Sequence, residues 1–280
     1  MNGKVVLLTG ATEGIGKAAA HVLAGSGATL VVVGRNSDKT RALELELRSK
    51  TSNERVESII ADLSVQSGVR AAADAFLARH ERLDVLANNA GAVFTEYEET
   101  SDGIERTFAL NHLSYFLLTH LLSDRLKATP GARVVSTSSG AHRSGKLANL
   151  DHVVRNPDKR AGFTAYGDSK LANILFTREH SRRIPGVLAN CFHPGFVATG
   201  FGQNNGGLLG WGMRVAAPWV ARTPEKGAET LVWLATDPEA GKISGEYFLD
   251  CKVKRSSARA RDEKLASDLW TLSQKLCGIA

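Results

Sequence analysis

The stretch Thr9-Gly10-Ala11-Thr12-Glu13-Gly14-Ile15-Gly16 decides the fold. It lies between an apolar run, Val5–Thr9, and a helical pattern, Ile15–Ala24. Glycines at such a point let the chain turn tightly and let its backbone approach a pyrophosphate. The helix that begins there directs free N–H groups and the positive end of its dipole at the phosphates. Many strand-to-helix turns are rich in glycine, but the position between the first strand and the first helix favours dinucleotide binding.

Outward from this turn, short β-branched runs alternate with helical stretches along the whole chain. The runs are apolar almost throughout, as expected when helices cover both faces of a parallel sheet. Repeated units of this spacing predict a doubly wound α/β sheet with right-handed crossovers. No linker or repeat divides the chain, so we expect one domain over residues 1–280. We expect about seven strands, at Val5–Thr9, Ala28–Val33, Val56–Ala61, Leu83–Asn88, Arg133–Thr137, Val187–Phe192 and Glu246–Leu249, and long helices at Gly103–Leu126 and Thr164–Ile184.

Cysteine spacing and net charge exclude several classes of protein. The three cysteines, Cys191, Cys251 and Cys277, form no CxxC pair and indicate neither a disulfide framework nor a zinc site. No other metal-ligand spacing occurs, so we expect no metal. The net charge is +6, and much of the excess lies at 252–261. Because no aromatic residues are interleaved there, we expect a solvated tail and no nucleic-acid partner.

The chain shows no pattern for targeting or for crossing a membrane. No signal peptide precedes Val5. The longest uncharged segment, Phe196–Met213, is rich in Gly and Asn and too polar to span a bilayer. We therefore expect a cytoplasmic protein with no integral membrane segment.

Polar motifs recur at the ends of the later strands and in the helices between them. They are Asp62-Leu63, Asn88-Asn89-Ala90-Gly91, Asn111, Ser138-Ser139, Tyr166-Gly167-Asp168-Ser169-Lys170, and His193-Pro194-Gly195 with Thr199. In this order, and with the glycine spacing Gly-x-x-x-Gly-x-Gly, they resemble the short-chain dehydrogenase/reductase family over roughly residues 4 to 250. The resemblance implies a single-domain Rossmann fold and a nicotinamide dinucleotide cofactor.

The resemblance also implies which residues hold the cofactor. Asp62 lies where the family usually places an acid that contacts adenine, and Asn89 belongs to the motif that lines the cofactor cleft. We expect cofactor contacts from Gly10, Thr12, Glu13, Gly14, Ile15, Gly16, Arg35, Asn36, Asp62, Leu63, Asn89, Ala90, Gly91, Tyr166, Lys170, Pro194, Gly195, Val197 and Thr199.

Tyr166 and Lys170 have the spacing that acid–base chemistry on a carbonyl needs. The reduction puts a hydride on carbon and a proton on oxygen, and an ordinary tyrosine, with a pKa of about 10, needs help near pH 7. A lysine at i+4 shares the helix face and favours the phenolate. The Tyr-x-x-x-Lys pattern alone often arises by chance. The resemblance implies that Tyr166 is the general acid/base, and that Lys170 lowers its pKa and binds the ribose hydroxyls.

Two more catalytic residues follow from the resemblance. Ser139 would hydrogen-bond the substrate carbonyl oxygen, and we choose it over Ser138 because family members place the catalytic hydroxyl last before a variable segment. Asn111 would hold a kinked helix and a water that links Lys170 to solvent. Without the resemblance, the serines could cap a helix and Asn111 could satisfy buried backbone groups.

The end of the second strand bears on the choice of cofactor. NAD-specific members usually carry an acid there, whereas this chain has Gly34-Arg35-Asn36, with Lys39 close by in the sequence. A planar guanidinium suits a 2′-phosphate, although Arg35 could also be an ordinary surface residue. Glu13 opposes this preference, because an acid in the glycine-rich turn repels a phosphate. We expect NADP(H), with NAD(H) as the less favoured cofactor.

The substrate side resembles the retinol dehydrogenase-like and protochlorophyllide reductase-like branch of the family. The resemblance rests on the length of 140–165 and on Ser169–Asn173, and that branch favours bulky apolar carbonyls and alcohols. The segment of about 196–220 is expected either to order over the substrate as a lid or to be a surface helix or an oligomer contact. Residues of about 252–280 form a helical tail. His142 is either a substrate contact or an exposed loop residue.

The implied function is an oxidoreductase that interconverts a small-molecule carbonyl, an aldehyde or ketone, and an alcohol. The alternative is a non-catalytic NADP(H)-binding protein with a regulatory or partner-binding role, because the fold alone does not imply catalysis. The set Asn111, Ser139, Tyr166 and Lys170 favours the enzyme. A light-driven reductase is disfavoured because only Cys191 lies near the predicted site. Relatives often form homo-oligomers, and the sequence leaves both an oligomer and a monomer open.

Overall fold

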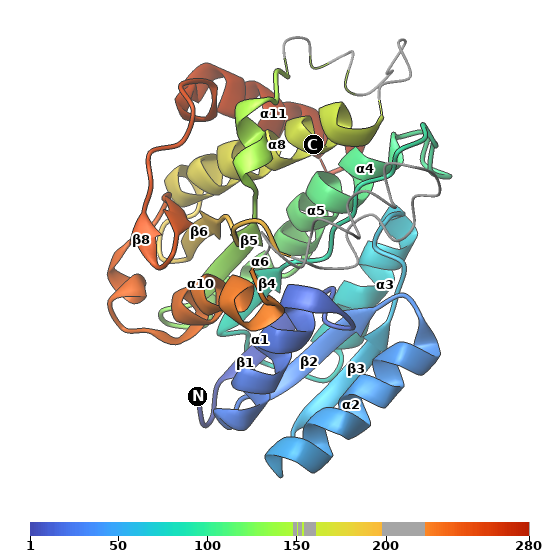
Figure 1. The fold of residues 1–280 in the computed structure, drawn as a ribbon, viewed down its shortest axis with the longest axis vertical. Coiled ribbons are helices and arrows are strands. Elements are labelled where there is room, and N and C mark those ends of the chain that lie inside the picture. The colour runs from blue at the N-terminus through green and yellow to red at the C-terminus, as the bar shows by residue number, and fades with distance from the viewer. Residues whose placement is uncertain (148–149, 151–152, 154–160, 198–221, 280) are drawn as a thin grey trace.

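One sheet organises the computed structural model, which describes residues 1–147, 150, 153, 161–197 and 222–279. Within these residues it has eight strands in the order β3-β2-β1-β4-β5-β6-β7-β8 (Figure 1). β1 lies between β2 and β4, so the chain order reverses there, and doubly wound folds bind their ligands at such a point. The expected doubly wound α/β fold is confirmed. The strands are β1 (Val5–Thr9), β2 (Thr29–Gly34), β3 (Val56–Ile60), β4 (Val85–Asn88), β5 (Arg133–Thr137), β6 (Leu188–Phe192), β7 (Tyr247–Leu249) and β8 (Lys252–Val253).

The strand β8 was not expected from the sequence. It pairs with β7 in an antiparallel hairpin through Asp250 and Cys251, whose φ angles are 51° and 58°. Two-residue hairpins of this kind usually carry Gly, Asn or Asp in the left-handed positions. Because Cys251 gives no such signal, the sequence predicted about seven strands rather than eight.

Helices cover both faces of the sheet. One face carries α1 (Gly14–Gly25), α2 (Ser37–Thr51) and α10 (Pro224–Thr236). The other carries α3 (Gln66–Leu77), α5 (Ser114–Leu121), α8 (Gly162–Arg183) and α11 (Glu263–Leu276).

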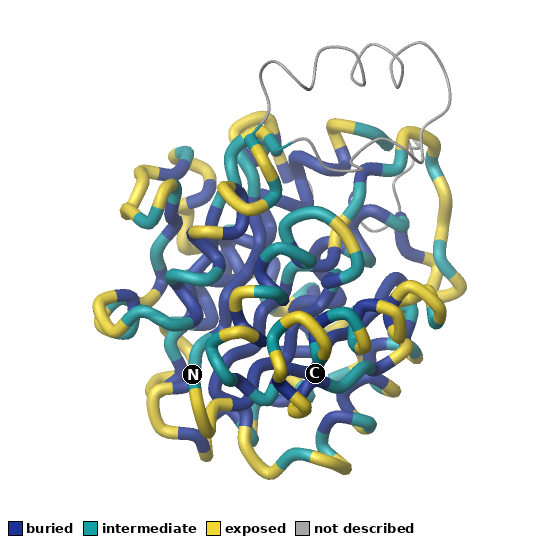
Figure 2. The backbone as a smooth tube through the Cα atoms, turned by 60° about the horizontal axis from the view of Figure 1, so that its bottom comes forward, coloured by how far each residue is buried: buried dark blue, intermediate teal, exposed yellow. Residues whose placement is uncertain are grey.

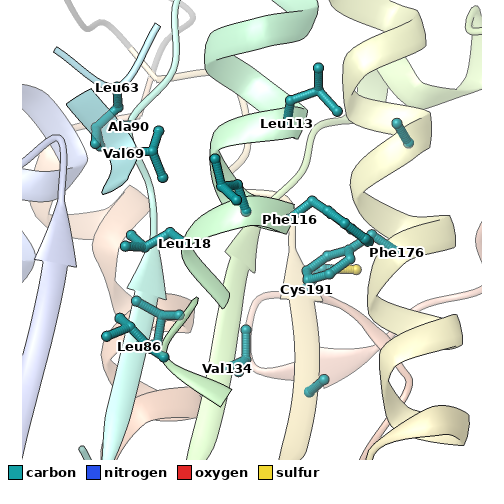
Figure 3. Packing of buried hydrophobic residues seen from close by; sticks show 14 of the residues in the cluster. Leu63, Val69, Leu86, Ala90, Leu113, Phe116, Leu118, Val134, Phe176 and Cys191 are labelled. Atoms are coloured by element: carbon teal, nitrogen blue, oxygen red, sulfur yellow. The ribbon is translucent and has the colours of Figure 1, made fainter. Parts of the chain in front are cut away.

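Alternate residues of β1 belong to the two cores. Val6 and Leu8 pack on the side of α1, and Val5 and Leu7 on the side of α5 and α8. This two-sided burial explains why the strands read as apolar runs. Figure 2 shows the buried residues concentrated in the middle of the molecule, and Figure 3 shows the α5–α8 side, where Phe116 lies beside other members of that core.

The helix expected over Gly103–Leu126 is present over most of that range, but its predicted start and its predicted continuity were wrong. It begins as α4 (Arg106–Phe108), continues as a π-helical segment, Ala109–Leu113, and then as α5. A break at Leu122 separates α5 from α6 (Ser123–Lys127). The start is moved by the buried Glu105, whose carboxylate accepts from the N–H groups of two following residues, each at 2.8 Å. A side-chain cap of this kind forms where the rest of the fold buries the acid. The spacing of apolar residues in the sequence does not indicate that burial.

Some of the expected features lie outside the described residues. These are Thr199, most of the segment of about 196–220, and most of the stretch between residues 147 and 161. Among the described residues, no helix has the length and apolar composition that crossing a bilayer requires.

Candidate active site

The glycine-rich turn is packed at backbone contact. Gly10 and Gly14 have φ angles of 67° and 54°, in the left-handed region. A Cβ on Gly16 would lie 2.1 Å from the carbonyl oxygen of Gly10, and a Cβ on Gly10 would lie 2.6 Å from the Cα of Ala90. α1 begins directly after Glu13, which makes no side-chain cap. The Glu13 side chain therefore leaves the first N–H groups of α1 uncapped, which the expected phosphate contact requires.

Thr9 and Asn89 join this turn to the end of β4. The Thr9 hydroxyl oxygen accepts from the N–H groups of Asn89 at 2.9 Å and Ala90 at 3.0 Å. The Asn89 amide donates to the carbonyl oxygens of Thr9 at 3.2 Å and Gly10 at 3.1 Å. The Asn89 side chain thus ties the glycine-rich turn to the end of β4, and its amide hydrogens are already used by the protein.

The residues expected at the adenosine end lie around the start of α2. Arg35 is exposed, and the Asn36 side chain caps α2 by accepting from the N–H of Lys39 at 2.9 Å. The Lys39 ammonium lies 2.5 Å from the carboxylate of Glu13. The acid that argued against a 2′-phosphate is therefore paired with a cation. Because its charge is paired, Glu13 repels a 2′-phosphate less strongly than an unpaired acid would.

Three more residues that were expected to contact the cofactor, Thr12, Asp62 and Leu63, contact neighbouring protein groups. A Cβ on Gly34 would lie 3.1 Å from the Thr12 methyl, so the end of β2 packs closely against the glycine-rich turn. Asp62 accepts from the Ser64 N–H and hydroxyl at 2.9 and 2.7 Å. The side chain of Leu63 is buried in the core, so only its backbone can face the cleft (Figure 3).

The two serines after β5 differ in direction. The Ser138 hydroxyl is buried and donates to the carbonyl oxygen of Lys170 at 2.8 Å. The Ser139 side chain hydrogen-bonds with the hydroxyl of Tyr166 and accepts from the N–H of Ala141 at 3.2 Å. Only Ser139 therefore has its hydroxyl beside the tyrosine, which agrees with the choice made from the resemblance.

Lys170 lies one helical turn after Tyr166 on α8. Its Nζ atom is 5.5 Å from the centre of the Tyr166 ring and 5.7 Å from that of Tyr115, and donates to the carbonyl oxygen of Thr137 at 3.1 Å. Tyr115 and Thr137 were not identified from the sequence. Thr137 acts through its backbone, so its residue type gave no signal.

Burial dominates the electrostatics of the pair. It raises the pKa of Tyr166 to about 12, and the hydrogen bond from Ser139 acts in the opposite direction. Burial lowers the pKa of Lys170 to about 7. Near pH 7 the tyrosine is protonated and the lysine is close to half charged. This protonation state suits donation of a proton to a carbonyl oxygen.

Asn111 lies in the π-helical segment and is fully buried. Its side chain accepts from the N–H of Ala92 and donates to the carbonyl oxygen of the same residue, both at 2.9 Å. It also donates to the Ser169 hydroxyl at 3.1 Å. A Cβ on Gly91 would lie 3.1 Å from Asn111 and 3.4 Å from Lys170 Nζ, so this glycine lets the chain after β4 approach both side chains closely.

The loop after β6 closes the site from the other side. A Cβ on Gly195, whose φ is 84°, would lie 2.6 Å from the Arg222 side chain. Val197 forms an isolated parallel bridge with Arg222, which is ion-paired with Asp250. Pro194 is partly exposed beside Gly195, and Thr199 lies outside the described residues.

His142 differs from both of its sequence interpretations. It is fully buried, so it is neither exposed nor open to a substrate. Its Nδ1 atom lies 2.6 Å from the carbonyl oxygen of Ser139, and its Nε2 accepts from the N–H of Ser257 at 3.2 Å. The first partner only accepts and the second only donates, so the ring is neutral with its hydrogen on Nδ1. His142 supports the backbone that carries Ser139.

Comparison with known proteins places the chain in a family. Residues 4–206 match the model of the short chain dehydrogenase family. The chain is 42% identical over 280 residues to retinol dehydrogenase 12 of Mus musculus, which covers 99% of this chain and 87% of that protein. Among solved structures, an uncharacterized protein from Mycobacterium paratuberculosis has a TM-score of 0.79 and 30% identity, covering 99% of this chain and 94% of that chain.

A second solved structure was determined with a bound nucleotide. It is a blue fluorescent protein from a metagenomic library in complex with NADPH, with a TM-score of 0.68 and 28% identity over 88% of this chain and 95% of that chain. The family match and the extent of the similarity lead to one conclusion. The chain belongs to the short-chain dehydrogenase/reductase family of carbonyl and alcohol oxidoreductases, on its retinol dehydrogenase-like branch.

Proposed function

We propose that the protein is an NADP(H)-dependent enzyme that interconverts a bulky apolar aldehyde or ketone and its alcohol, with Tyr166 as general acid/base. The observation that carries this proposal is the buried Tyr166, with the half-buried Ser139 side chain within its hydrogen-bonding reach and Lys170 Nζ 5.5 Å from the centre of its ring. These groups lie at the end of β5, and β5 is next to β4, whose end contacts the glycine-rich turn.

Each catalytic side chain has one task in the reduction. The bound nicotinamide supplies the hydride. Tyr166 donates its phenolic proton to the substrate oxygen, which the Ser139 hydroxyl holds beside it and stabilises as negative charge develops. The Lys170 ammonium favours the phenolate that remains on Tyr166. Asn111 keeps the end of β4 in place through both backbone groups of Ala92.

A dinucleotide fits the glycine-rich turn because the glycines of that turn carry no side chains. Because a Cβ on Gly16 would lie 2.1 Å from backbone, only glycine leaves main-chain N–H groups free to approach a pyrophosphate there. Arg35 and the N–H groups at the start of α2 would hold a 2′-phosphate. Lys39, which is ion-paired with Glu13, would add a second cation when it is released from that pair. The similar blue fluorescent protein was solved with NADPH, which supports the same cofactor here.

The preference for a bulky apolar substrate rests on two observations. Phe163 lies three residues before Tyr166 on the same face of α8, and 59% of it is exposed. Phe196, just after the Pro194-Gly195 turn, is also 59% exposed. Exposed large apolar side chains that are close in sequence to the proposed site favour an apolar ligand. The similar retinol dehydrogenases bear the name of such a substrate.

A screen of NADPH consumption over apolar aldehydes and ketones tests the proposal. Turnover that is abolished by Tyr166→Phe supports the mechanism, because phenylalanine keeps the packing and removes only the proton donor. Substantial turnover of Tyr166→Phe would remove Tyr166 as the acid. Tight NADPH binding without turnover on any compound favours a non-catalytic binding protein.

The cofactor preference has its own measurement. The ratio of kcat/KM for NADPH to that for NADH should exceed one, and Arg35→Asp should reverse it, because a carboxylate repels the 2′-phosphate and accepts from a 2′-hydroxyl. A higher kcat/KM with NADH in the natural protein contradicts the proposed preference.

A further inference from the structure

A second buried polar cluster lies behind the catalytic residues, on the side of α11. Asn173 lies on α8 three residues after Lys170 and is fully buried. Its Nδ2 atom donates to the carbonyl oxygens of Asn111 at 2.9 Å and Thr137 at 3.1 Å. The Thr137 oxygen also accepts from Lys170 Nζ at 3.1 Å. Asn173 and Lys170 therefore share one acceptor.

The orientation of the Asn173 amide is determined by its partners. Only its NH₂ group can face two carbonyl oxygens, so the amide oxygen must point the other way. There it lies 3.2 Å from Nδ1 of His112, which is on the π-helical segment next to Asn111. Because an amide oxygen only accepts, the imidazole must carry a hydrogen on Nδ1.

His112 continues the connection to α11. Its Nε2 atom lies 3.1 Å from the Ser273 hydroxyl, which is itself 2.8 Å from the carbonyl oxygen of Leu269. Complete burial, together with the charge of Lys170, lowers the pKa of His112 to about 4, so the ring is neutral near pH 7. The single hydroxyl proton of Ser273 then serves two acceptors, the imidazole and the Leu269 carbonyl.

We infer that Asn173, His112 and Ser273 form a positioning chain through which the C-terminal helix α11 sets the place of the Lys170 amino group. The inference rests on the proposed function, because Lys170 is catalytic only under that proposal. None of the three touches reacting atoms. Asn173 holds the Thr137 carbonyl group, which accepts from Lys170 Nζ, and the Asn111 carbonyl group of the π-helical segment. His112 and Ser273 hold Asn173 in place.

The chain connects parts of the protein that are distant in sequence. His112 and Ser273 are 161 residues apart, and His112 and Asn173 are 61 apart. Such a link lets α11 influence a reacting group that it does not contact. A displacement of a reacting group by about 1 Å can lower the rate by about a hundredfold. A looser Thr137 carbonyl therefore affects kcat more than it affects binding.

The closing experiment compares two buried histidines that pack against the same ring. His112 and His180 lie 6.3 and 5.8 Å from the Phe176 ring, measured between ring centres, and each is at most 2% exposed. Among the described residues, Nδ1 of His180 has no hydrogen-bond partner. His112→Phe should lower kcat by about tenfold and change the Kd for NADPH by less than about twofold. His180→Phe should leave both unchanged.

A second pair of variants keeps the inference testable if His112→Phe fails to fold. Ser273→Ala removes the last hydroxyl of the positioning chain, whereas Ser267→Ala removes a hydroxyl of the same helix that accepts from Arg183 at 3.1 Å. We expect Ser273→Ala to lower kcat by about threefold, and Ser267→Ala to have no effect. His112→Gln, which keeps an N–H donor, should recover part of the kcat that His112→Phe loses.

Two results would overturn the inference. One is a kcat within twofold of the natural protein in both His112→Phe and Ser273→Ala. The other is an equal loss of kcat in His112→Phe and His180→Phe, since that would be a packing effect. Turnover that survives in Tyr166→Phe would instead overturn the proposed function. The histidine comparison would still stand, because it needs only a measurable turnover by the natural chain.

Discussion

The proposed cofactor half and the proposed catalytic half of the site, called below the cofactor half and the catalytic half, are held together by different means. Around Gly10 and Gly16, main-chain atoms meet at distances that leave no room for a Cβ. Around Lys170, buried side chains such as Asn111 and Asn173 hold main-chain carbonyl groups through hydrogen bonds. The first half is therefore sensitive to one added carbon atom. The second is sensitive to one lost hydrogen-bonding group.

Gly16→Ala should have the largest effect. The added methyl would lie 2.1 Å from the Gly10 carbonyl oxygen and 2.7 Å from the Asn89 amide, so the turn must open. Overpacking of this kind costs about 1–3 kcal/mol. Because the displaced backbone is the phosphate site, we expect the Kd for NADPH to rise by about a hundredfold. Titration of NADPH binding, with thermal unfolding in parallel, measures both effects.

Gly25→Ala is the matched control at the other end of α1. A Cβ there meets nothing closer than 3.9 Å. Replacing glycine by alanine in a compatible conformation stabilises by about 0.4–1 kcal/mol through the unfolded chain. NADPH binding should not change. Equal binding losses in the two variants would show that the cofactor half does not depend on close backbone contact.

The Ser138 and Ser139 pair tests the catalytic half. Ser139→Ala removes the hydroxyl beside Tyr166 and should lower kcat by about a hundredfold, as the loss of one preorganised donor does. Ser138→Ala removes a donor to the Lys170 carbonyl and should cost about 1 kcal/mol of folding free energy with a smaller loss of kcat. Steady-state kinetics and denaturant unfolding of both variants separate the roles. A larger loss of kcat in Ser138→Ala would reverse the assignment.

The same contrast explains which features could be predicted from the sequence. The glycine-rich turn and the apolar strands could, because their physical requirements restrict the residue type at each position. Tyr166 and Lys170 could be proposed because their spacing on one helix, in order with the other motifs, resembles the family. These features are local, so a pattern in the sequence reports them directly.

The remaining features depend on contacts between distant segments. The late start of the helix expected over Gly103–Leu126 follows from the burial of Glu105, whose carboxylate caps the first N–H groups. The burial of His142 depends on Ser257, 115 residues away. Asn173 was noted only as part of a motif, and its partner His112 has no feature in the sequence that marks it as buried. Hydrogen-bond networks of this kind leave no periodic signal.

The pH dependence of reduction tests how burial tunes the catalytic half. Burial lowers the pKa of Lys170 to about 7 and raises that of Tyr166 to about 12. Below pH 7 the lysine is an ammonium that stabilises the tyrosyl phenolate, and the tyrosine stays protonated throughout the usual range. The value of kcat/KM for reduction should therefore fall by about tenfold per unit as pH rises above 7.

Oxidation of the alcohol should have the opposite dependence, because it requires the phenolate form of Tyr166 as base. Initial rates of reduction and of oxidation, measured between pH 6 and pH 9, test the two pH dependences. A reduction profile that is flat over this range would mean that the charge of Lys170 does not contribute.

Glu13→Gln should have the smallest effect, because it changes an exposed ion pair at the edge of the cofactor half. The Glu13 and Lys39 side chains lie 2.5 Å apart and are each 59% exposed, and exposed pairs contribute about 0.2–1 kcal/mol. Removing the carboxylate frees Lys39 for a 2′-phosphate. We expect the NADPH-to-NADH ratio of kcat/KM to rise by about two- to fivefold. The gain should shrink at high salt, which screens exposed charges. A ratio that falls would mean that Glu13 holds Lys39 in its binding position, so that this edge, like the catalytic half, depends on a positioned side chain.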